Sequence, residues 1–251
     1  MPFFENTFSP DQADSPDIAF EAAQAVGHFL KKLADFPAEK LVETIPGFHD
    51  TARRWIVFEE ILAKNPANRL QSAAREVGLL FSNRSFFEKI IALKNSGDLP
   101  LRATHNDPKI ANVLLDIFTK KAVAVIDWDT AMPGSIPSDF GDMLRSFGPT
   151  LAEDDPDFEK MDLNLPVVEA MCHGFLSEAA PFLTVVEREN LFAGGQWIVF
   201  EQALRFLTDY LAGDVYYRTA YADHNLVRAR NQLALLAAVG RHERTIRGFL
   251  R

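Results

Sequence analysis

Two short polar segments contain the residues with the clearest chemical potential. The first reads THNDPKIAN and contains Asp107 and Asn112, and the second reads IDWD and contains Asp127. A carboxylate and an amide provide the oxygen ligands that suit Mg²⁺, which also keeps several waters and takes phosphate oxygens. Asp107 could reach the same cavity and accept a proton from a substrate hydroxyl. These residue types predict phosphoryl transfer from a nucleoside triphosphate, with Lys109 available to neutralise phosphate charge.

The elements expected around these segments form a β-hairpin. Residues 112–116 and 122–126 are short apolar runs rich in β-branched side chains, and a polar turn at residues 119–121 joins them. Asn112 stands at the start of the first run, and Asp127 directly follows the second. Because antiparallel pairing brings these two positions to the same open end, the hairpin predicts a cation site made of residues distant in sequence.

Most of the remaining chain has the periodicity of helices. Asp17 is available as the N-cap of the first one. We expect helices at residues 18–33, 51–63, 70–80, 85–93, 185–211 and 225–250. Residues 1–17, with prolines among polar and acidic residues, are predicted to be a flexible lead-in. Residues 18–251 are predicted to form one lobe, mostly helical and of the α+β class.

Composition excludes several classes of protein. A chain of 251 residues that is 47% hydrophobic can bury one sizeable core. The formal net charge of -9 argues against nucleic acid as a partner, because phosphate-backbone binding needs clustered Lys and Arg. The lone Cys172 is expected in the core, and a single thiol fits a reducing compartment. Without a long apolar run or a signal pattern, we expect a cytoplasmic protein without a membrane partner.

Other candidate sites are not supported by their sequence context. His49, His173 and His224 lack a metal-ligand spacing with one another, so we expect none of them to bind a metal. The surroundings of Cys172 do not fit a Cys/Ser-x-Pro-x-Arg sulfatase motif, and no Gly-x-Ser-x-Gly elbow is present. Both observations argue against a hydrolase.

The spacing of the polar residues resembles a known catalytic arrangement. The pattern His105-x-Asp107-x-x-x-x-Asn112, followed by Ile126-Asp127, resembles the catalytic loop and the metal-binding aspartate of kinase-like folds. This version is that of the aminoglycoside phosphotransferase and choline kinase superfamily, in which Ile-Asp-aromatic-acidic replaces the Asp-Phe-Gly of protein kinases. The resemblance implies the C-terminal lobe of a kinase-like fold, with the hairpin at its active site.

Longer segments resemble one branch of that superfamily. From about residue 19 onward the chain is similar to the N-acetylhexosamine 1-kinases, in the segments LADFPAEKLVETIPGFHDT, THNDPKIANVLLD, VIDWDTAMPG, DFGD and RFLTDYLAGDVYYRTAYADHNLVRARNQ. This resemblance implies an ATP-dependent sugar kinase of carbohydrate metabolism. Its product would be a sugar 1-phosphate, formed on the anomeric hydroxyl of N-acetylglucosamine or N-acetylgalactosamine.

The resemblance also implies roles for the residues of the catalytic loop. Asp107 would be the general base, Lys109 would face the transferred phosphate of the nucleotide, and His105 would support the loop. Asp139 and Asp142 follow a loop rich in Gly and Pro, as the second aspartate does in this superfamily. Asp139 is expected to hold the catalytic loop by accepting backbone hydrogen bonds.

Binding of the metal would involve residues on both sides of the hairpin. The resemblance implies that Asn112 and Asp127 bind the Mg²⁺ that accompanies ATP. Asp129 is either a further metal ligand or a solvated carboxylate, because only its spacing from Asp127 argues for a role.

Candidate acceptor-binding residues lie in the C-terminal third of the chain. Arg205 stands at helical spacing from Glu201 and Asp209, which predicts an ion pair on the helix face. The resemblance adds that Arg205 and Tyr216 lie where the acceptor sugar is held. Arg donates to sugar or acetamide oxygens, and a tyrosine offers both a hydroxyl and an apolar ring face. Packing within the lobe is the alternative role for Tyr216 and Tyr217.

The sequence departs from a complete kinase of this type in one respect. The strand-rich N-terminal lobe, with its glycine-rich loop over the phosphates, has no counterpart, because Gly27, Gly47 and Gly78 stand alone. We expect one of three explanations: a fragment of a longer kinase, a truncated product that retains only binding, or a lobe completed by another polypeptide. The first two are favoured. Turnover by this length of chain stays open. A fragment would expose the apolar surface that faces the missing lobe, which predicts self-association.

Three functions remain open at this stage. The first is the sugar kinase, and the second is a kinase of an aminoglycoside or of an amino alcohol such as choline. The third is a binding module without catalysis. An acidic acceptor cavity would favour the cationic acceptors, whereas Arg205 near the acceptor favours an oxygen-rich sugar.

Overall fold

The structure is a computed structural model that describes residues 3–251. The α-helices are α1 Pro16–Lys32, α2 Thr51–Lys64, α3 Ala74–Ser82, α4 Ser85–Ser96, α5 Ile136–Phe147, α6 Leu165–Ala179, α7 Val185–Glu189, α8 Leu191–Ala212, α9 His224–Arg241 and α10 Glu243–Phe249. Short 3₁₀ turns are η1 Ala38–Lys40, η2 Gln71–Ala73, η3 Ile110–Asn112, η4 Trp128–Thr130 and η5 Phe158–Lys160. The strands are β1 Thr7–Phe8, β2 Arg102–Thr104, β3 Val113–Asp116, β4 Ala122–Val125 and β5 Met132–Gly134.

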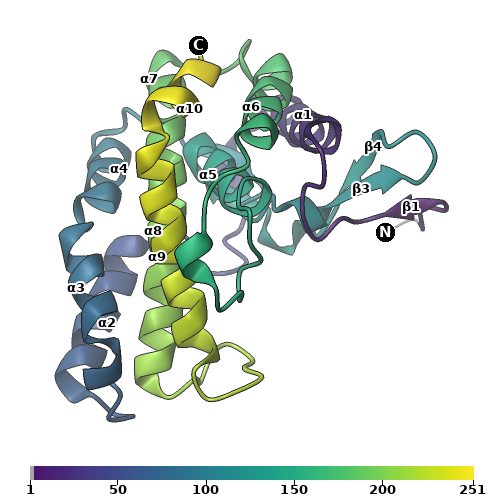
Figure 1. Ribbon diagram of the computed structural model, residues 1–251. Helices are drawn as coiled ribbons and strands as arrows, with labels where there is room; N and C mark the ends of the chain where they lie inside the picture. The colour runs from purple at the N-terminus through teal and green to yellow at the C-terminus, as the bar shows by residue number, and fades with distance from the viewer. Residues whose placement is uncertain (1–2) are drawn as a thin grey trace.

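Helix α8 forms the centre of the core. Its sequence is apolar on nearly every side, which is the pattern of a helix enclosed by others. It packs against α5 and α9, and α2 and α4 contact it from another side. Figure 1 shows α2, α3 and α4 on one side of the α8–α9 pair and α1, α5 and α6 on the other. Cys172 of α6 is fully buried in this core, as the sequence predicted.

Helices α5 and α8 cross at a contact that only glycine permits. A Cβ on Gly194 would overlap the carbonyl oxygen of Pro137, and a Cβ on Gly141 would overlap the carbonyl oxygen of Gly194. The two backbones therefore touch directly. This contact fixes the start of α5, which follows β5, against the central helix.

The substitution Gly194→Ala should destabilise the fold by about 1–3 kcal/mol, because the added methyl group cannot be accommodated without moving a helix. Gly240→Ala is the matched control, since among the described residues no atom lies within 4 Å of the Cβ it would add. That change should be neutral or stabilise α9 by up to about 1 kcal/mol. Urea unfolding of the two variants measures the difference, and equal stabilities would contradict the close contact.

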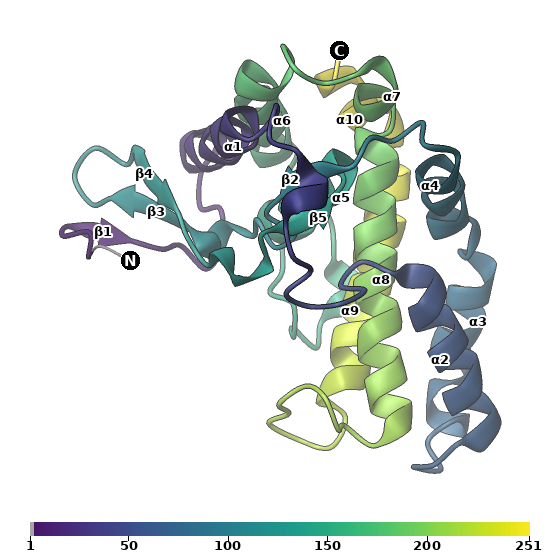
Figure 2. The ribbon, with the colours of Figure 1, turned by 180° about the vertical axis from the view of Figure 1, so that it is seen from behind.

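The predicted β-hairpin is confirmed. Strands β3 and β4 pair antiparallel, with Val113 opposite Val125 and Leu114 opposite Ala124. Strand β1 adds to the other edge of β3, and the resulting sheet projects from the helices near the N-terminus (Figures 1 and 2). A second small sheet pairs β2 with β5. The two sheets hold both ends of the segment between β2 and β3.

The segment predicted as a flexible lead-in is partly ordered in the structure. Thr7 pairs with Asp116 and Phe8 with Leu115, because the outer edge of β3 offers unpaired backbone groups. Helix α1 begins at Pro16, and its N-cap is Ser15, whose hydroxyl accepts the N–H of Ile18 at 3.3 Å, in place of the expected Asp17. Residues 1–2 of the lead-in lie outside the described residues.

The two long C-terminal helices are each interrupted once. Residues 185–211 divide into α7 and α8 at Asn190, whose side-chain amide donates to the carbonyl oxygen of Val186 at 2.8 Å. A capping box of Thr184 and Glu187 starts α7 separately. Residues 225–250 likewise divide into α9 and α10 at His242. Within residues 3–251, no helix has both the length and the apolarity to cross a membrane.

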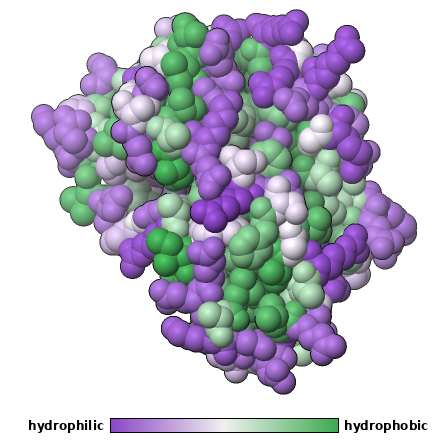
Figure 3. Space-filling view, turned by 90° about the vertical axis from the view of Figure 1, so that its left-hand side faces the viewer, coloured by the Kyte–Doolittle hydropathy of each residue, from purple (hydrophilic) through white to green (hydrophobic). Residues whose placement is uncertain are grey.

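Apolar side chains reach the surface at several places. Figure 3 shows apolar patches interleaved with hydrophilic side chains on the face toward which α2, α3 and α4 lie. Exposed apolar residues of α2 and α3 are Ile56, Val57, Leu79 and Phe81. A second group near η1 and η4 is Phe36, Val42, Ile45 and Trp128.

Candidate active site

The polar segment between β2 and β3 is a loop held by a buried carboxylate. Asp139, in the first turn of α5, accepts the backbone N–H groups of His105 and Asn106, each at 2.9 Å. The expectation that Asp139 holds this loop by accepting backbone hydrogen bonds is confirmed. Burial raises the pKa of Asp139 to about 6, although the backbone N–H groups of His105 and Asn106 oppose the shift. The loop is thus fixed by a group that solvent does not reach.

His105 connects the loop to the end of the hairpin. Its Nε2 lies 2.8 Å from the carbonyl oxygen of Ile126, and its Nδ1 accepts the N–H of Asp107 at 3.3 Å. One ring nitrogen therefore donates and the other accepts, which makes His105 a neutral imidazole protonated on Nε2. The side chain is completely buried. This position suits the predicted support of the loop, and the role in catalysis stays a prediction.

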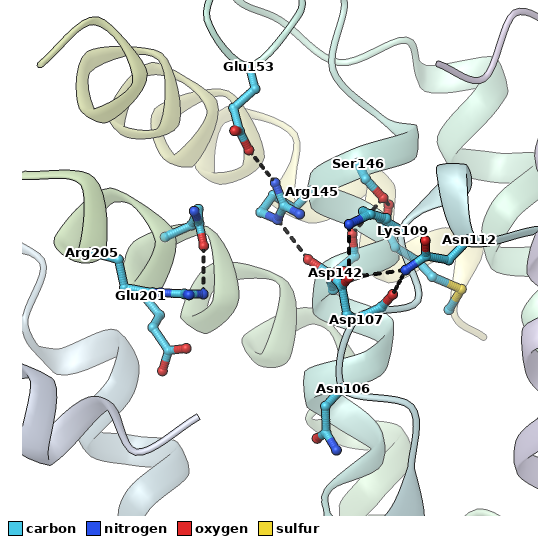
Figure 4. Close-up of polar contacts among 12 residues, drawn as sticks. Asn106, Asp107, Lys109, Asn112, Asp142, Arg145, Ser146, Glu153, Glu201 and Arg205 are labelled. Carbon is cyan, nitrogen blue, oxygen red and sulfur yellow. Dashed lines mark hydrogen bonds and ion pairs between the residues drawn. The ribbon is translucent and has the colours of Figure 1, made fainter. Parts of the chain in front are cut away.

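Asp107, Lys109 and Asn112 converge within the loop (Figure 4). The Lys109 ammonium lies 2.9 Å from Oδ2 of Asp107. The side-chain amide of Asn112 donates to the backbone oxygen of Asp107 at 2.8 Å and to its Oδ2 at 3.1 Å. Because the nitrogen of Asn112 is engaged in this way, its Oδ1 is left without a hydrogen bond among residues 3–251 and can serve a cation.

The surroundings of Asp107 favour its protonated form. Burial raises the pKa of Asp107, and the negative charge of Asp142 raises it further against the attraction of Lys109. Asp142 is buried and pairs with Arg145 at 2.7 Å, which in turn binds Glu153 at 2.8 Å (Figure 4). A carboxylate with raised proton affinity is suited to receive a proton near neutral pH. Sequence reasoning singled out Asp142 but missed Arg145, which stands three residues later on the same helix.

Asn112 and Asp127 lie together at the open end of the hairpin, as the antiparallel pairing predicts. The N–H of Ile126 donates to the backbone oxygen of Asn112 at 2.8 Å. Asp127 adopts a left-handed conformation with φ of 65°, and its exposed carboxylate has no hydrogen bond in the described part of the chain. Burial lowers the pKa of Lys109, but Asp107, Asp142 and Asp127 outweigh it and raise the pKa overall.

This donor set suits a hard cation that keeps most of its own shell. An amide oxygen and a carboxylate provide two oxygen ligands, which is the number that Mg²⁺ commonly takes from a protein when phosphates supply the rest. Across residues 3–251 there is no cluster of three or more His, Cys, Asp or Glu side chains arranged to hold a metal. The residues therefore fit Mg²⁺ carried by a nucleotide better than a metal bound by protein alone.

Asp129 lies in η4 with an exposed side chain. Its backbone oxygen accepts the hydroxyl of Thr44 at 2.7 Å, which joins this turn to the loop before α2. The geometry fits both a metal ligand and a solvated carboxylate, so both predictions for Asp129 stay open.

The ion pair predicted for Arg205 is wrong. In the part of the chain that the structure describes, Arg205 pairs with neither Glu201 nor Asp209. Its guanidinium donates to Gln202 at 3.1 Å and lies over the rings of Phe48 and Tyr217, at 5.5 and 5.6 Å from their centroids. Arg205 also lines a cavity.

Other partners bind the two carboxylates that the helix spacing assigned to Arg205. Glu201 accepts hydrogen bonds from His49 and Thr51. Asp209 accepts the backbone N–H groups of the loop after α8, at Val215, Tyr216 and Tyr217. A spacing rule within one helix cannot predict these contacts, because the partners of both carboxylates lie outside α8.

Arg205 and Tyr216 line one cavity of about 410 Å³. The cavity lies between α2, the end of α8 and the loop that follows it, and Arg54 and Tyr217 also line it. Tyr216 is 71% exposed, so packing within the lobe does not explain it. Tyr217 does pack in this way, since its ring lies 4.7 Å from that of Phe206.

A second cavity, of about 520 Å³, adjoins the first and reaches the catalytic loop. The two share the loop before α2 at Pro46 and Gly47. His49, Lys94 and Asn106 line the second cavity. Figure 4 shows Arg205 and Glu201 on α8 and Asp107 on the loop across from it. Sequence reasoning missed this cavity, because its walls come from five separate segments.

Comparison with known proteins agrees with this arrangement. A family described as "Phosphotransferase enzyme family" matches residues 6–171. A solved choline kinase from Cryptosporidium parvum Iowa II superposes with a TM-score of 0.54 at 13% identity, covering 92% of this chain and 67% of that one. An ethanolamine kinase from Plasmodium vivax superposes with a TM-score of 0.54 at 15% identity, covering 90% and 64%.

These comparisons establish the fold. The chain has the predicted α+β, mostly helical fold of a kinase-like C-terminal lobe, with a hairpin beside the candidate site. It spans about two thirds of the length of the two solved kinases, by the coverages of 67% and 64%. At these identities the likeness concerns the fold and not the acceptor.

Proposed function

Because the chain belongs to the phosphotransferase enzyme family, we propose that its site transfers the γ-phosphoryl group of ATP to the anomeric hydroxyl of an N-acetylhexosamine. The product would be the sugar 1-phosphate. The observation that carries the choice of acceptor is the guanidinium of Arg205, which has no ion pair with its helix neighbours and lines a cavity that adjoins the one reaching Asn106.

The catalytic loop would perform the transfer as follows. The carboxylate of Asp107 takes the proton of the acceptor hydroxyl as the oxygen bonds to the γ-phosphorus, and the bond from that phosphorus to the ADP oxygen breaks. Lys109 lies 2.9 Å from Asp107 and would neutralise charge on the transferred group. Asn112 and Asp127 would hold Mg²⁺, which supplies charge neutralisation at the phosphates when bound. His105 would support the loop.

Three cationic side chains in the acceptor cavity favour an oxygen-rich acceptor. Arg53, Arg54 and Arg205 line it, together with the acidic Asp50 and Asp209. Burial lowers the pKa of Arg54; Glu201 opposes that shift, and the positive charge of Arg205 adds to it. A guanidinium donates hydrogen bonds to hydroxyl and acetamide oxygens, whereas it repels an ammonium group. A neutral acetamido sugar therefore suits the cavity better than an aminoglycoside.

A choline-type acceptor is the second candidate, because the two solved kinases of this fold are named for choline and ethanolamine. Aromatic rings can enclose a quaternary ammonium group. In this cavity, however, Arg205 already lies over the faces of Phe48 and Tyr217. A second cation at those rings would meet the first, which argues against choline.

We also propose that residues 18–251 form the catalytic lobe of a longer enzyme. Exposed Val42, Ile45 and Trp128, near the hydrogen bond of Thr44 to Asp129, support an apolar surface beside the metal-binding turn. A binding module without turnover is the alternative for this length of chain. Self-association through this surface stays a prediction.

The test is product formation from ATP and Mg²⁺ with N-acetylglucosamine, N-acetylgalactosamine, galactose, choline or kanamycin as acceptor. We expect a sugar 1-phosphate, seen by ³¹P NMR, from the acetamido sugars alone. Phosphocholine as the main product would overturn the choice of acceptor. No product with any acceptor would leave the fold in place and favour the binding module.

Arg205→Gln should raise the KM for the sugar by about 10–100-fold and leave the KM for ATP unchanged, because a charged donor to the acceptor is lost. Arg228→Gln is the matched control, since Arg228 lies on α9 over the ring of Phe206 and lines neither cavity. Steady-state kinetics of both variants provide the measurement. If Arg205→Gln raised the KM for ATP as much as the KM for the sugar, Arg205 would not belong to the acceptor site.

A further inference from the structure

His49 bridges the central helix and the catalytic loop. Its Nδ1 lies 2.8 Å from Oε1 of Glu201 on α8, and its Nε2 lies 2.9 Å from the backbone oxygen of Asn106. The His49 side chain is 11% exposed and that of Glu201 is 2% exposed. Asn106 is the residue directly before Asp107.

The two hydrogen-bond partners determine the protonation of His49. A carbonyl oxygen can only accept, and an ionised carboxylate can only accept, so each ring nitrogen of His49 must donate. The Arg54 guanidinium lies 3.9 Å from Glu201 and Thr51 donates a hydrogen bond to it, so Glu201 is the ionised carboxylate although burial opposes its charge. His49 is therefore an imidazolium. His105 provides the contrast, because it has one donor and one acceptor contact and is neutral.

The charges around His49 come from several elements. Arg54 of α2 lies 3.9 Å from Glu201, and Thr51 donates a hydrogen bond to the other oxygen of that carboxylate. Asp139 of α5 is also close enough to be affected by His49. Burial raises the pKa of Asp139, and the charge of His49 lowers it by a smaller amount. Other charged groups also lie near His49. They are Glu43, Asp50, Arg53 of α2, Lys94 of α4 and Arg205 of α8.

The contact of His49 with the loop is made at a strained position. Asn106 has φ of 65°, which a residue with a side chain rarely adopts. Asp139 holds the N–H of Asn106 from one side, and His49 holds its carbonyl oxygen from the other. His49 thus holds the peptide group between Asn106 and Asp107, and Asp139 holds the peptide group before it.

We propose that His49 is a positioning residue, held as an imidazolium by Glu201, that orients the catalytic loop and thereby the carboxylate of Asp107. Glu201 lies one helical turn before Arg205 on α8, so the same helix carries the proposed acceptor contact and the support of the base. This inference rests on the proposed function. It adds a residue from outside the catalytic loop to the groups that set the geometry of transfer.

A double-mutant cycle tests the pair. His49→Gln keeps a donor for Asn106 but turns its amide oxygen toward the Glu201 carboxylate, so kcat should fall by about 10–100-fold with the KM for ATP unchanged. In the double variant His49→Gln/Glu201→Gln the two amides can pair with each other. Its kcat should therefore recover at least a third of the difference between His49→Gln and the wild type. His173→Gln is the matched control, since His173 is exposed on α6 and should keep full activity.

NMR of the ¹⁵N-labelled chain tests the inference without turnover. We expect the ring nitrogens of His49 to show the shifts of an imidazolium at neutral pH and those of His105 to show a neutral ring. His49→Gln should move the backbone amide signals of Asn106 and Asp107, and His173→Gln should not. A neutral His49, or unmoved loop amides in His49→Gln, would overturn the proposal. If the wild-type chain turns over no acceptor, the proposed function fails, and these signals alone decide the role of His49.

Discussion

Replacing Asp107 with asparagine should lower the rate of phosphoryl transfer by about 10²–10⁴-fold and leave the fold intact. The amide has nearly the same size as the carboxylate, but it cannot take the proton of the acceptor hydroxyl. The loss should appear in kcat, because binding of ATP and of the sugar does not require the proton to move. The measurement is kcat at saturating ATP, Mg²⁺ and acetamido sugar.

The same substitution at an exposed carboxylate provides the control. Asp157 forms an exposed contact with Lys160 at 2.6 Å, so Asp157→Asn should keep the full rate. Circular dichroism of both variants checks that the helices remain. A rate for Asp107→Asn within about threefold of wild type would remove Asp107 from the role of base.

The hairpin and its flanking polar residues could be predicted because their signals are local. Short apolar runs define β3 and β4, and antiparallel pairing then requires Asn112 and Asp127 to meet at one end. The contacts of Asp139 with the catalytic loop join residues that are 34 and 33 positions apart in the sequence. No local pattern predicts such contacts, and the expectation came from the resemblance to kinase-like folds. Local pattern and family likeness were both needed to predict the candidate site.

The surroundings of α8 could not be predicted from helix spacing. Arg205 stands one turn from Glu201 and from Asp209, yet both carboxylates are bound by other groups. His49 contacts Glu201 although the two are 152 positions apart in the sequence. Such a contact inside the core stabilises the fold more than a solvated ion pair on a helix face does. Strand β1 was missed for a similar reason. A run of only two residues shows no alternating pattern in the sequence, and the strand forms because the edge of β3 lies beside it.

Glu201→Ala should reduce the free energy of unfolding by about 3–5 kcal/mol at neutral pH, because it removes one partner of a buried charged network. Glu201 is 2% exposed, and it accepts hydrogen bonds from His49 at 2.8 Å and from Thr51. Its pKa is lowered from 4.5 to about 2. A shift of that size corresponds to about 3 kcal/mol of stabilisation, in agreement with the first figure. Urea unfolding followed by tryptophan fluorescence provides the measurement.

The pH dependence and a matched variant separate this effect from the mere loss of a side chain. Because the folded pKa lies below the unfolded one, Glu201 stabilises the fold fully above about pH 4.5 and progressively less as the pH falls toward 2. The penalty of Glu201→Ala should therefore shrink in acid. Glu243→Ala removes an exposed carboxylate that pairs with Arg247 at 2.7 Å, and should cost at most about 0.5 kcal/mol at any pH. A penalty for Glu201→Ala as small as that of Glu243→Ala would mean that the charge of Glu201 does not stabilise the junction of α8 with the catalytic loop.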